Sequence, residues 1–323
     1  MTNSKPVISC NNVWKLFGFA PEKYLKTLSE DRSYEEIQAD GYIAGVKDVS
    51  VDVFEGEMLV IMGLSGSGKS TLLRCMSRLH DITGGTIKID DQDIMALEEK
   101  ELINLRRNKM GMVFQSFGLL PHRSVLENVA FPLEMRGQSK HDRRDRALEV
   151  IKLVGLEGRE DYFPRELSGG QQQRVGIARS LAIEPDIWFL DEPFSALDPL
   201  IRREMQDEFL RLQDMLGKTI IFVTHDFDEA LRLADRIAIM KDGAIEQCDT
   251  PDKIVLNPAT DYVAKFTQEI DTARVVRAKT LMRAGAKKSI TGVALSANAT
   301  IQELARTIVN DARKEFPIED EKG

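Results

Sequence analysis

Apolar runs separated by helical patterns recur along the chain and predict its main elements. Three short apolar runs are each followed by polar residues: Met110–Phe114, Ile187–Leu190 and Thr219–Val223. Uninterrupted runs of this kind are typical of parallel strands buried on both faces. A further run, Val46–Val53, alternates apolar and polar residues, which indicates a half-exposed strand. Helical patterns lie between these runs, and the alternation predicts an α/β fold.

The N-terminal region predicts one more strand and then an insertion. Val7–Val13 alternates loosely, which favours a strand, and Lys15–Gly18 is expected to end it. Residues 19–40 are rich in Glu, Lys and Arg and contain the capping-box pattern Ser33-x-x-Glu36. We therefore expect residues 19–40 to form an inserted helical segment.

One glycine-rich segment carries the strongest chemical signal. It follows the apolar run Met58–Met62, precedes a helical pattern, and reads Gly-Leu-Ser-Gly-Ser-Gly-Lys-Ser-Thr over residues 63–71. Strand, glycine loop and helix start form the context of a phosphate-binding loop, whose backbone N–H groups surround an anion. Lys69 is expected to reach the β- and γ-phosphates of a nucleotide, and the Ser70 hydroxyl to hold Mg²⁺. The nucleotide-binding candidates are Gly63, Ser65, Gly66, Ser67, Gly68, Lys69, Ser70 and Thr71.

Two carboxylates follow the apolar run Ile187–Leu190. In a phosphate-loop protein the first of them, Asp191, is placed to position Mg²⁺. The second, Glu192, is placed to orient and deprotonate an attacking water. Alone, such a pair is equally typical of a solvated acidic turn, and its pairing with a phosphate loop favours the catalytic interpretation.

A second anion-binding element is predicted at Leu167-Ser168-Gly169-Gly170-Gln171, which opens a helical pattern containing Arg174. One nucleotide needs a single phosphate cradle from its own subunit. A second cradle, with Ser168, Gly169, Gly170 and Gln171 as candidate ligands, therefore predicts a two-fold dimer that encloses two ATP molecules. The plainer alternative is a helix cap by Ser168.

Three further residues have positions that favour a role at the nucleotide. His225 follows the apolar strand pattern and is placed to contact a γ-phosphate, although a lone histidine is also compatible with a structural role. Gln115 follows Met110–Phe114 and is a candidate ligand of Mg²⁺ or of the attacking water, or else a loop glutamine. Phe17 is a candidate for stacking on adenine, or else a core aromatic.

Composition narrows the class of protein. The chain has 323 residues, 42% hydrophobic and 30% charged, as in ordinary globular proteins. The net charge of −8 gives no reason to expect a nucleic-acid partner. The cysteines Cys10, Cys75 and Cys248 are widely spaced, which fits a reducing compartment and no zinc site. No apolar h-region begins the chain, and no apolar run approaches the ~18 residues that span a bilayer. Any membrane role is therefore expected to be peripheral.

The sequence changes character after about residue 270. A stretch without acidic residues is followed by an amphipathic helical pattern over Ile301–Val309 and by a strand-like end. This stretch is expected to be a linker, or to bind anionic lipid headgroups of a membrane. Its basic residues are Arg274, Arg277, Lys279, Arg283, Lys287 and Lys288.

Taken together, the motifs over residues 6–270 resemble the nucleotide-binding subunit of ATP-binding-cassette (ABC) transporters. The resemblance identifies residues 63–70 with the Walker A loop, Ile187–Asp191 with Walker B and Glu192 with the catalytic glutamate. It also identifies Gln115 with the Q-loop, Leu167–Gln171 with the signature motif and His225 with the switch histidine. Asp198 belongs to the D-loop, Ser195-Ala196-Leu197-Asp198.

This resemblance implies a domain organisation and a set of partners. Residues 1–270 would be the ATPase domain, with a helical subdomain at about 116–182, and residues 271–323 a basic linker and tail. Ser168 and Gly170 would contact the γ-phosphate held by a second copy, and Ser116–Val125 would grip a coupling helix of a membrane permease. ATP and Mg²⁺ are the implied cofactors, and a location on the cytoplasmic face of the inner membrane follows.

A narrower resemblance concerns the transported solute. The 19–40 insertion, Gly63-Leu64-Ser65 and Val113–Arg123 resemble importers of glycine betaine, proline betaine and related quaternary amines. Such importers receive solute from a periplasmic or lipid-anchored binding protein. Another small polar solute, such as an amino acid or trimethylamine N-oxide, stays open, as does a soluble cassette ATPase acting outside transport.

The tail is similar to part of a regulatory module of those importers. Val293–Gly323 resembles the first half of a CBS module, in which Phe316-Pro317-Ile318 would be a strand and residues 320–323 its turn. Residues 271–323 are too few for a complete pair of CBS modules. We therefore expect either a shortened family member or a truncated chain.

Overall fold

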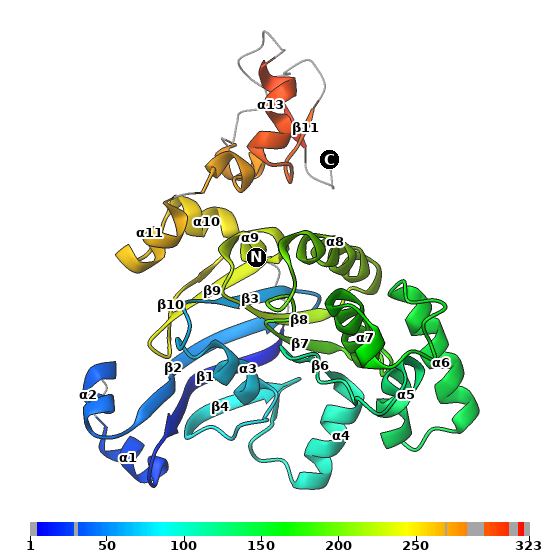
Figure 1. Cartoon of the computed structure of the whole chain (residues 1–323). Helices are drawn as coiled ribbons and strands as arrows, with labels where there is room; N and C mark the ends of the chain where they lie inside the picture. Colours follow the sequence, from blue (N-terminus) through cyan, green and yellow to red (C-terminus); the bar gives the residue numbers. More distant parts are fainter. Residues whose placement is uncertain (1–4, 29–31, 269, 283–293, 310–315, 320–323) are drawn as a thin grey trace. The chain divides into compact units, whose positions relative to one another are not determined.

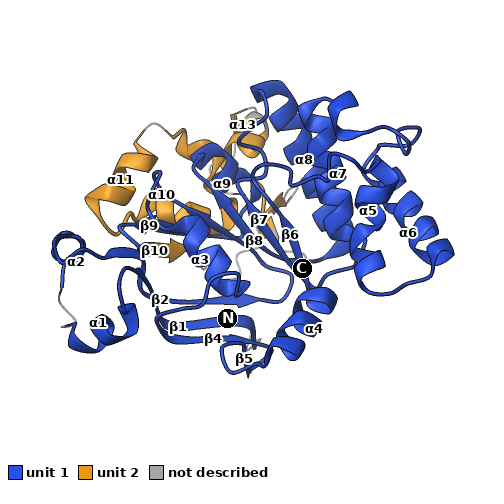
Figure 2. Ribbon diagram, turned by 60° about the horizontal axis from the view of Figure 1, so that its bottom comes forward, with its two compact units in different colours: residues 1–245 blue, residues 246–323 orange. Residues whose placement is uncertain are grey.

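The computed structural model describes residues 5–28, 32–268, 270–282, 294–309 and 316–319. Contacts divide the chain into two compact units, residues 1–245 and 246–323, shown in different colours in Figure 2. The division falls inside strand β10 (Ala244–Asp249). The predicted domain boundary at residue 270 stays a prediction.

A six-stranded sheet has the order β10-β9-β3-β8-β7-β6, and its strands β9, β3, β8, β7 and β6 lie wholly within the first unit. The β6–β7, β7–β8, β8–β3 and β3–β9 pairs are all parallel. Every residue of β3, β7 and β8 is buried, because helices cover both faces. Full burial is thereby confirmed for the predicted runs Ile187–Leu190 and Thr219–Val223. The prediction is wrong at the end of Met110–Phe114, because β6 ends at Val113 and Phe114 is 38% exposed. The strands span Met58–Met62 (β3), Met110–Val113 (β6), Ile187–Asp191 (β7), Thr219–Thr224 (β8) and Arg236–Lys241 (β9).

A second, four-stranded sheet has the order β2-β1-β4-β5, and its pairs are antiparallel. Buried and exposed residues alternate along β2, as predicted for Val46–Val53. The first strand ends within Lys15–Gly18, as expected, but it is longer than the predicted Val7–Val13. Pairing with β2 carries β1 on to Phe17, which lies opposite Ile43. The strands span Pro6–Phe17 (β1), Ile43–Phe54 (β2), Gly84–Ile89 (β4) and Gln92–Asp93 (β5).

The 19–40 insertion is helical, as predicted. It contains α1 (Pro21–Thr27) and α2 (Tyr34–Ala39). Ser33 and Glu36 form the expected capping box at the start of α2, which satisfies two backbone N–H groups. Ile37 of α2 packs with Leu16 in a small core, so the insertion is anchored to β1.

The remaining helices of the first unit divide into those that cover the sheet and a helical group. Helices α5, α6 and α7 pack on one another and lie together in green in Figure 1. They occupy the region predicted as a helical subdomain, with the short helix η1 (Pro164–Glu166) between them. The bounds are Lys69–Met76 (α3), Glu99–Lys109 (α4), Val125–Met135 (α5), Lys140–Leu153 (α6), Gly169–Leu181 (α7), Pro199–Leu216 (α8) and Phe227–Leu233 (α9).

Four fully buried aromatic rings lie between the sheet and α8. Phe209 of α8 lies 5.3 Å from Trp188, and 6.0 Å from both Phe194 and Phe222, between ring centroids. The Trp188 indole N–H donates to Ser180 Oγ at 2.8 Å, so its polar atom is satisfied inside the core. This cluster fixes α8 against the strands that carry the polar residues discussed below.

The second unit ends in a parallel β-α-β arrangement. β11 (Leu295–Ser296) pairs with β12 (Ile318–Glu319), and α13 (Ile301–Val309) lies between them in the chain, as the amphipathic pattern predicted. Leu295 and Leu304 belong to a small core. The likeness to half a CBS module stays a prediction, and its turn at residues 320–323 lies outside the described residues. The earlier helices are α10 (Pro251–Leu256), α11 (Asp261–Thr267), η2 (Thr272–Arg274) and α12 (Ala278–Leu281).

The aromatic cluster generates a stability prediction. Phe209→Ala should lower the free energy of unfolding by about 3–5 kcal/mol, because it removes a fully buried ring and leaves a cavity. Met215→Ala on the same helix should change it by less than about 0.5 kcal/mol, because Met215 is 53% exposed. Urea unfolding of the full chain measures both. Equal losses in the two variants would contradict the assigned core.

Candidate functional site

The phosphate loop leaves β3 with a backbone that only glycine fits. Gly63 and Gly68 have φ values of +152° and +99°. A Cβ atom would stand 2.2 Å from Met240 O at Gly63 and 2.1 Å from Gly45 O at Gly68. Both positions therefore require close approach of two backbone segments as well as an unusual φ. The loop between them keeps the open, concave path that a phosphate cradle needs.

Two buried polar side chains of this loop fit an anionic ligand. Lys69 is 5% exposed, and its ammonium donates to Leu64 O at 2.9 Å. Burial lowers the pKa of Lys69, while the carboxylates of Glu192 and Asp191 oppose this. Ser67 Oγ is buried and has no hydrogen-bond partner among the described residues. A phosphate group would give Ser67 the partner that it lacks and the Lys69 ammonium an anionic acceptor.

Asp191, at the end of β7, is held by two residues of α3. Its Oδ1 accepts from Ser70 Oγ at 2.6 Å, and its Oδ2 accepts from Arg74 Nη2 at 3.1 Å. The side chain of Asp191 is 1% exposed, so these partners offset the desolvation of its charge. The convergence of the Ser70 and Asp191 oxygens fits the predicted Mg²⁺ site. Sequence reasoning missed Arg74, although its position four residues after Ser70 puts it on the same helix face.

One carboxylate oxygen of Glu192 contacts two of the side chains that the sequence predicted at the site. Its Oε2 lies 3.0 Å from His225 Nδ1 and 3.3 Å from Gln115 Nε2. The three residues come from the ends of β7, β8 and β6, which meet at the carboxyl edge of the sheet. The Glu192 backbone has φ +46°, in a region that non-glycine residues rarely adopt. The catalytic candidates of the sequence are thus brought together in space.

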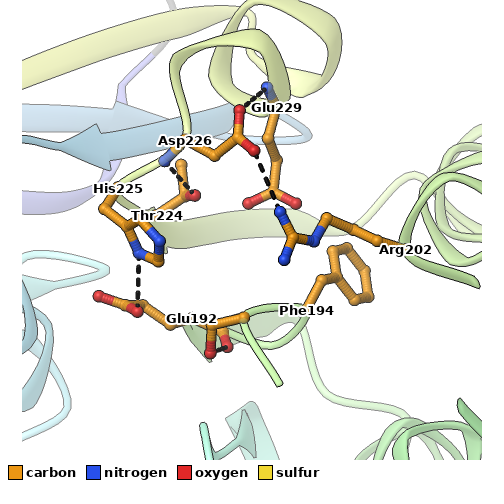
Figure 3. A pocket seen from close by; sticks show the side chains of 8 residues that line it. Glu192, Phe194, Arg202, Thr224, His225, Asp226 and Glu229 are labelled. Carbon is orange, nitrogen blue, oxygen red and sulfur yellow. Dashed lines mark hydrogen bonds and ion pairs between the residues drawn. The ribbon is translucent and has the colours of Figure 1, made fainter. Parts of the chain in front are cut away.

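A small polar cavity adjoins this cluster (Figure 3). His225 and Glu192 form one wall, and Asp226 and Arg202 face each other across another. Burial raises the pKa of Glu229, which also lines the cavity. Sequence reasoning did not select Arg202, Asp226 or Glu229, because nothing local marks them.

The second predicted anion-binding element forms a separate cluster. Ser168 caps α7: its Oγ accepts from Gln171 N at 3.4 Å, and its N–H donates to the Gln171 side chain at 3.0 Å. Asp198 caps α8 by accepting from Ile201 N at 3.1 Å. A Cβ at Gly170 would stand 2.6 Å from Ile201 Cγ2, so α7 meets the start of α8 closely there. The cap by Ser168 is real, and it leaves a role toward a second copy open.

Phe17 lies close to the helix start of the phosphate loop. A Cβ at Gly45 would stand 2.7 Å from the Phe17 ring and 2.9 Å from Thr71 Cγ2, so the two side chains border the same glycine. The ring is packed by Lys15 Nζ, 5.1 Å from its centroid, and edge-on by His80 at 6.0 Å. Phe17 is 39% exposed, which suits a stacking platform better than a core aromatic.

Comparison with known proteins agrees with these features. The ABC transporter family model matches residues 46–195. The trimethylamine N-oxide transport system ATP-binding protein TmoW of Ruegeria pomeroyi is 76% identical over 315 residues, covering 98% of this chain and 92% of that protein. The protein of the same name from Pelagibacter ubique is 61% identical, covering 98% and 93% of the two chains.

More distant relatives share the same core. The glycine betaine/proline betaine transport system ATP-binding protein ProV of Escherichia coli is 50% identical over 277 residues, covering 85% of this chain and 69% of ProV. A dimeric, post-hydrolysis ATP-binding cassette bound to ADP and Pi is 37% identical with a TM-score of 0.63, covering 75% and 98% of the two chains. With phosphate loop, paired carboxylates and signature element all in place, the chain belongs to the family of ABC transporter ATP-binding proteins, and it is an ATPase.

Proposed function

We propose that the chain energises import of a small trimethylamine-type solute through a membrane permease, with trimethylamine N-oxide first and betaines second. The observation that carries the solute class is the 76% identity, over nearly the whole chain, to a trimethylamine N-oxide transport protein. The betaine relatives are 50% identical and match a smaller part of the chain, so they take second place.

The nucleotide is held from three sides in this proposal. Backbone N–H groups of residues 63–70 and the Lys69 ammonium bind the phosphates, and Phe17 stacks on the base. Ser70, Gln115 and Asp191 would hold Mg²⁺, which would supply positive charge against that of the phosphates. Among the described residues no three His, Cys, Asp or Glu side chains form a metal cluster. A hydroxyl, an amide and one carboxylate still suit Mg²⁺, which keeps waters and phosphate oxygens as its other ligands.

Glu192 acts on the attacking water as a general base. His225 and Gln115 bind the same carboxylate oxygen, Oε2, and so orient the carboxylate of Glu192. The other oxygen, Oε1, is left to accept the proton of the water. The unusual backbone at Glu192 aims the side chain at this position.

The second cradle serves the nucleotide of another copy. Ser168 and Gly170 open α7, whose first N–H groups can bind a γ-phosphate. The dimeric form of the similar cassette supports a dimer that encloses ATP between two copies, with Asp198 near the shared boundary.

Attachment to the membrane is through partners in this proposal. Among the described residues, no helix combines the length and the apolar character that a membrane span requires. Residues 116–125 contact the permease on its cytoplasmic side, and the permease receives solute from a periplasmic or lipid-anchored binding protein. Arg274, Arg277 and Lys279 can add attraction to anionic headgroups. Their predicted companions Arg283, Lys287 and Lys288 lie outside the described residues.

The general-base role predicts a separation of binding from hydrolysis. Glu192→Gln should lower kcat for ATP by about 100-fold or more, because an amide cannot take the proton, while ATP binding is retained. Glu204→Gln, an exposed change on α8, is the matched control. Phosphate release and binding of radiolabelled ATP measure the two effects. Hydrolysis at the parental rate in Glu192→Gln would remove the assigned role.

If Ser168 contacts the γ-phosphate bound by a second copy, a negative charge at this position should by itself prevent ATP-dependent dimerisation. Ser168→Asp and Ser168→Asn both preserve the cap of α7, because each residue is a good N-cap. Only Asp adds a negative charge facing a γ-phosphate. Ser168→Asp should therefore abolish ATP-dependent dimers seen by light scattering, whereas Ser168→Asn retains a measurable fraction. Equal dimerisation in the two variants would contradict the shared site.

The solute class is tested with the full transporter in liposomes. The chain is reconstituted with its permease and solute-binding protein, and the ATPase rate is measured across trimethylamine N-oxide, glycine betaine, carnitine, choline and an amino acid. Trimethylamine N-oxide should stimulate hydrolysis most. Stimulation by the amino acid alone would overturn the proposed solute while leaving the ATPase assignment intact.

A further inference from the structure

Arg202 joins two segments of the first unit that the chain keeps far apart. It lies in the first turn of α8, four residues after Asp198. Its Nη2 donates to Leu197 O at 3.2 Å, and its Nη1 donates to Asp226 Oδ2 at 3.3 Å. One guanidinium thus contacts both the turn after β7 and Asp226, the residue that follows His225. Figure 3 shows the contact with Asp226.

The contacts of Arg202 close a ring around the cavity beside Glu192. Within the turn after β7, Ser195 Oγ donates to Glu192 O at 3.0 Å and Leu197 N donates to Phe194 O at 3.2 Å. Leu197 O then accepts from Arg202, whose other contact is Asp226. The ring is completed by His225, adjacent to Asp226 and 3.0 Å from Glu192 Oε2. Each member of this ring contacts the next, so Arg202 is one connection between the turn after β7 and the segment of His225. A second connection is direct, because Glu192 N–H donates to Val223 O of β8 at 3.0 Å.

Asp226 is held in place independently of Arg202. It caps α9, because its Oδ1 accepts from Glu229 N at 3.0 Å, and its own N–H donates to Thr224 Oγ1 at the same distance. Its Oδ2 is left for Arg202. A rigid carboxylate at the start of a helix is therefore the anchor, and the guanidinium ties the turn after β7 to it.

Partial burial makes this ion pair more than a surface contact. The side chains of Arg202 and Asp226 are 26% and 32% exposed, so solvent screens them less than it screens an exposed pair. The geometry also requires a guanidinium, because its Nη1 and Nη2 donate to two different acceptors. A lysine ammonium on a flexible side chain would bind the two acceptors less well.

We propose that Arg202 is a positioning residue for ATP hydrolysis: it fixes the turn Ser195–Asp198 to the segment carrying His225 and so sets the Glu192–His225 geometry. This inference rests on the proposed roles of Glu192 and His225. The proposal also connects the turn that faces a second copy with Glu192. A shift of Leu197 in this turn would move the guanidinium of Arg202, which accounts for the connection.

The charges around Arg202 argue against the alternative that the cavity binds an anion. Asp226, Glu229 and Glu192 line the cavity with Arg202 and His225. Three carboxylates against one permanent cation disfavour a negatively charged ligand in this cavity. The cation at Arg202 instead serves its two protein partners.

The test separates a positioning role from simple stabilisation. Arg202→Met should lower kcat about tenfold to 100-fold, because the base loses its fixed geometry, with KM for ATP within about twofold, because the phosphate loop is untouched. Arg202→Lys should recover part of kcat. Arg203→Met, an exposed neighbour on α8, is the matched control and should match the parent. Steady-state kinetics of the full-length chain with Mg-ATP, together with thermal unfolding, give these values.

A double-mutant cycle completes the test. Asp226→Asn keeps the cap of α9 but removes the charged partner of Arg202. If the two residues act as one bridge, Arg202→Met/Asp226→Asn should be no slower than the slower single variant. Three results would each overturn the inference. The first is a parental kcat in Arg202→Met, and the second is additive losses of kcat in the cycle. The third is a joint change of kcat and KM, with loss of thermal stability, in both Arg202→Met and Arg202→Lys. Glu192→Gln serves as reference: if it hydrolyses ATP normally, the proposed function fails, whatever Arg202 does.

Discussion

The register of the parallel strands is the constraint on which the site depends. Val113 pairs with Leu190, Asp191 with Val223, and Met62 with Thr224. Because the strands run in the same direction, their carboxyl ends come out at one edge within a residue or two of one another. Gln115, Glu192, His225 and the first glycine of the phosphate loop all follow these ends. A slip of one residue in any pair would turn its terminal side chains to the other face.

Burial then determines how charges at that edge are held. Asp191 is almost fully enclosed and is bound by Ser70 and Arg74, while the buried Lys69 lies near Asp191 and Glu192. Removing one partner from such a group is strongly destabilising, since it leaves an uncompensated charge in a medium of low dielectric. The edge therefore carries opposite charges close together, at the place where the nucleotide phosphates are proposed to bind.

Helices packed behind this edge of the sheet support Glu192 and His225, the two residues proposed to act in hydrolysis. The aromatic cluster around Phe209 fixes α8, and α8 carries Arg202 at its start. The same helix start is met by Gly170 of α7 through Ile201. The element predicted to face a second copy and the residue proposed to hold the base geometry thus meet the start of α8 at two consecutive residues, Ile201 and Arg202.

The α/β fold, the buried strands β7 and β8, the capping box at Ser33 and the phosphate-loop, carboxylate and signature motifs could all be predicted from the amino-acid sequence. Each rests on a local signal, since a period, a cap or a short motif is complete within about ten residues. Three features required the folded structure: the extension of β1 to Phe17, the binding of Asp191 by both Ser70 and Arg74, and the contact of Arg202 with Asp226. Each depends on residues distant in the chain: strand pairing with β2, the approach of α3 to β7, and the docking of α8 beside α9. No local pattern encodes such pairings, because their free energy comes from packing that exists only after the sheet and its helices have assembled.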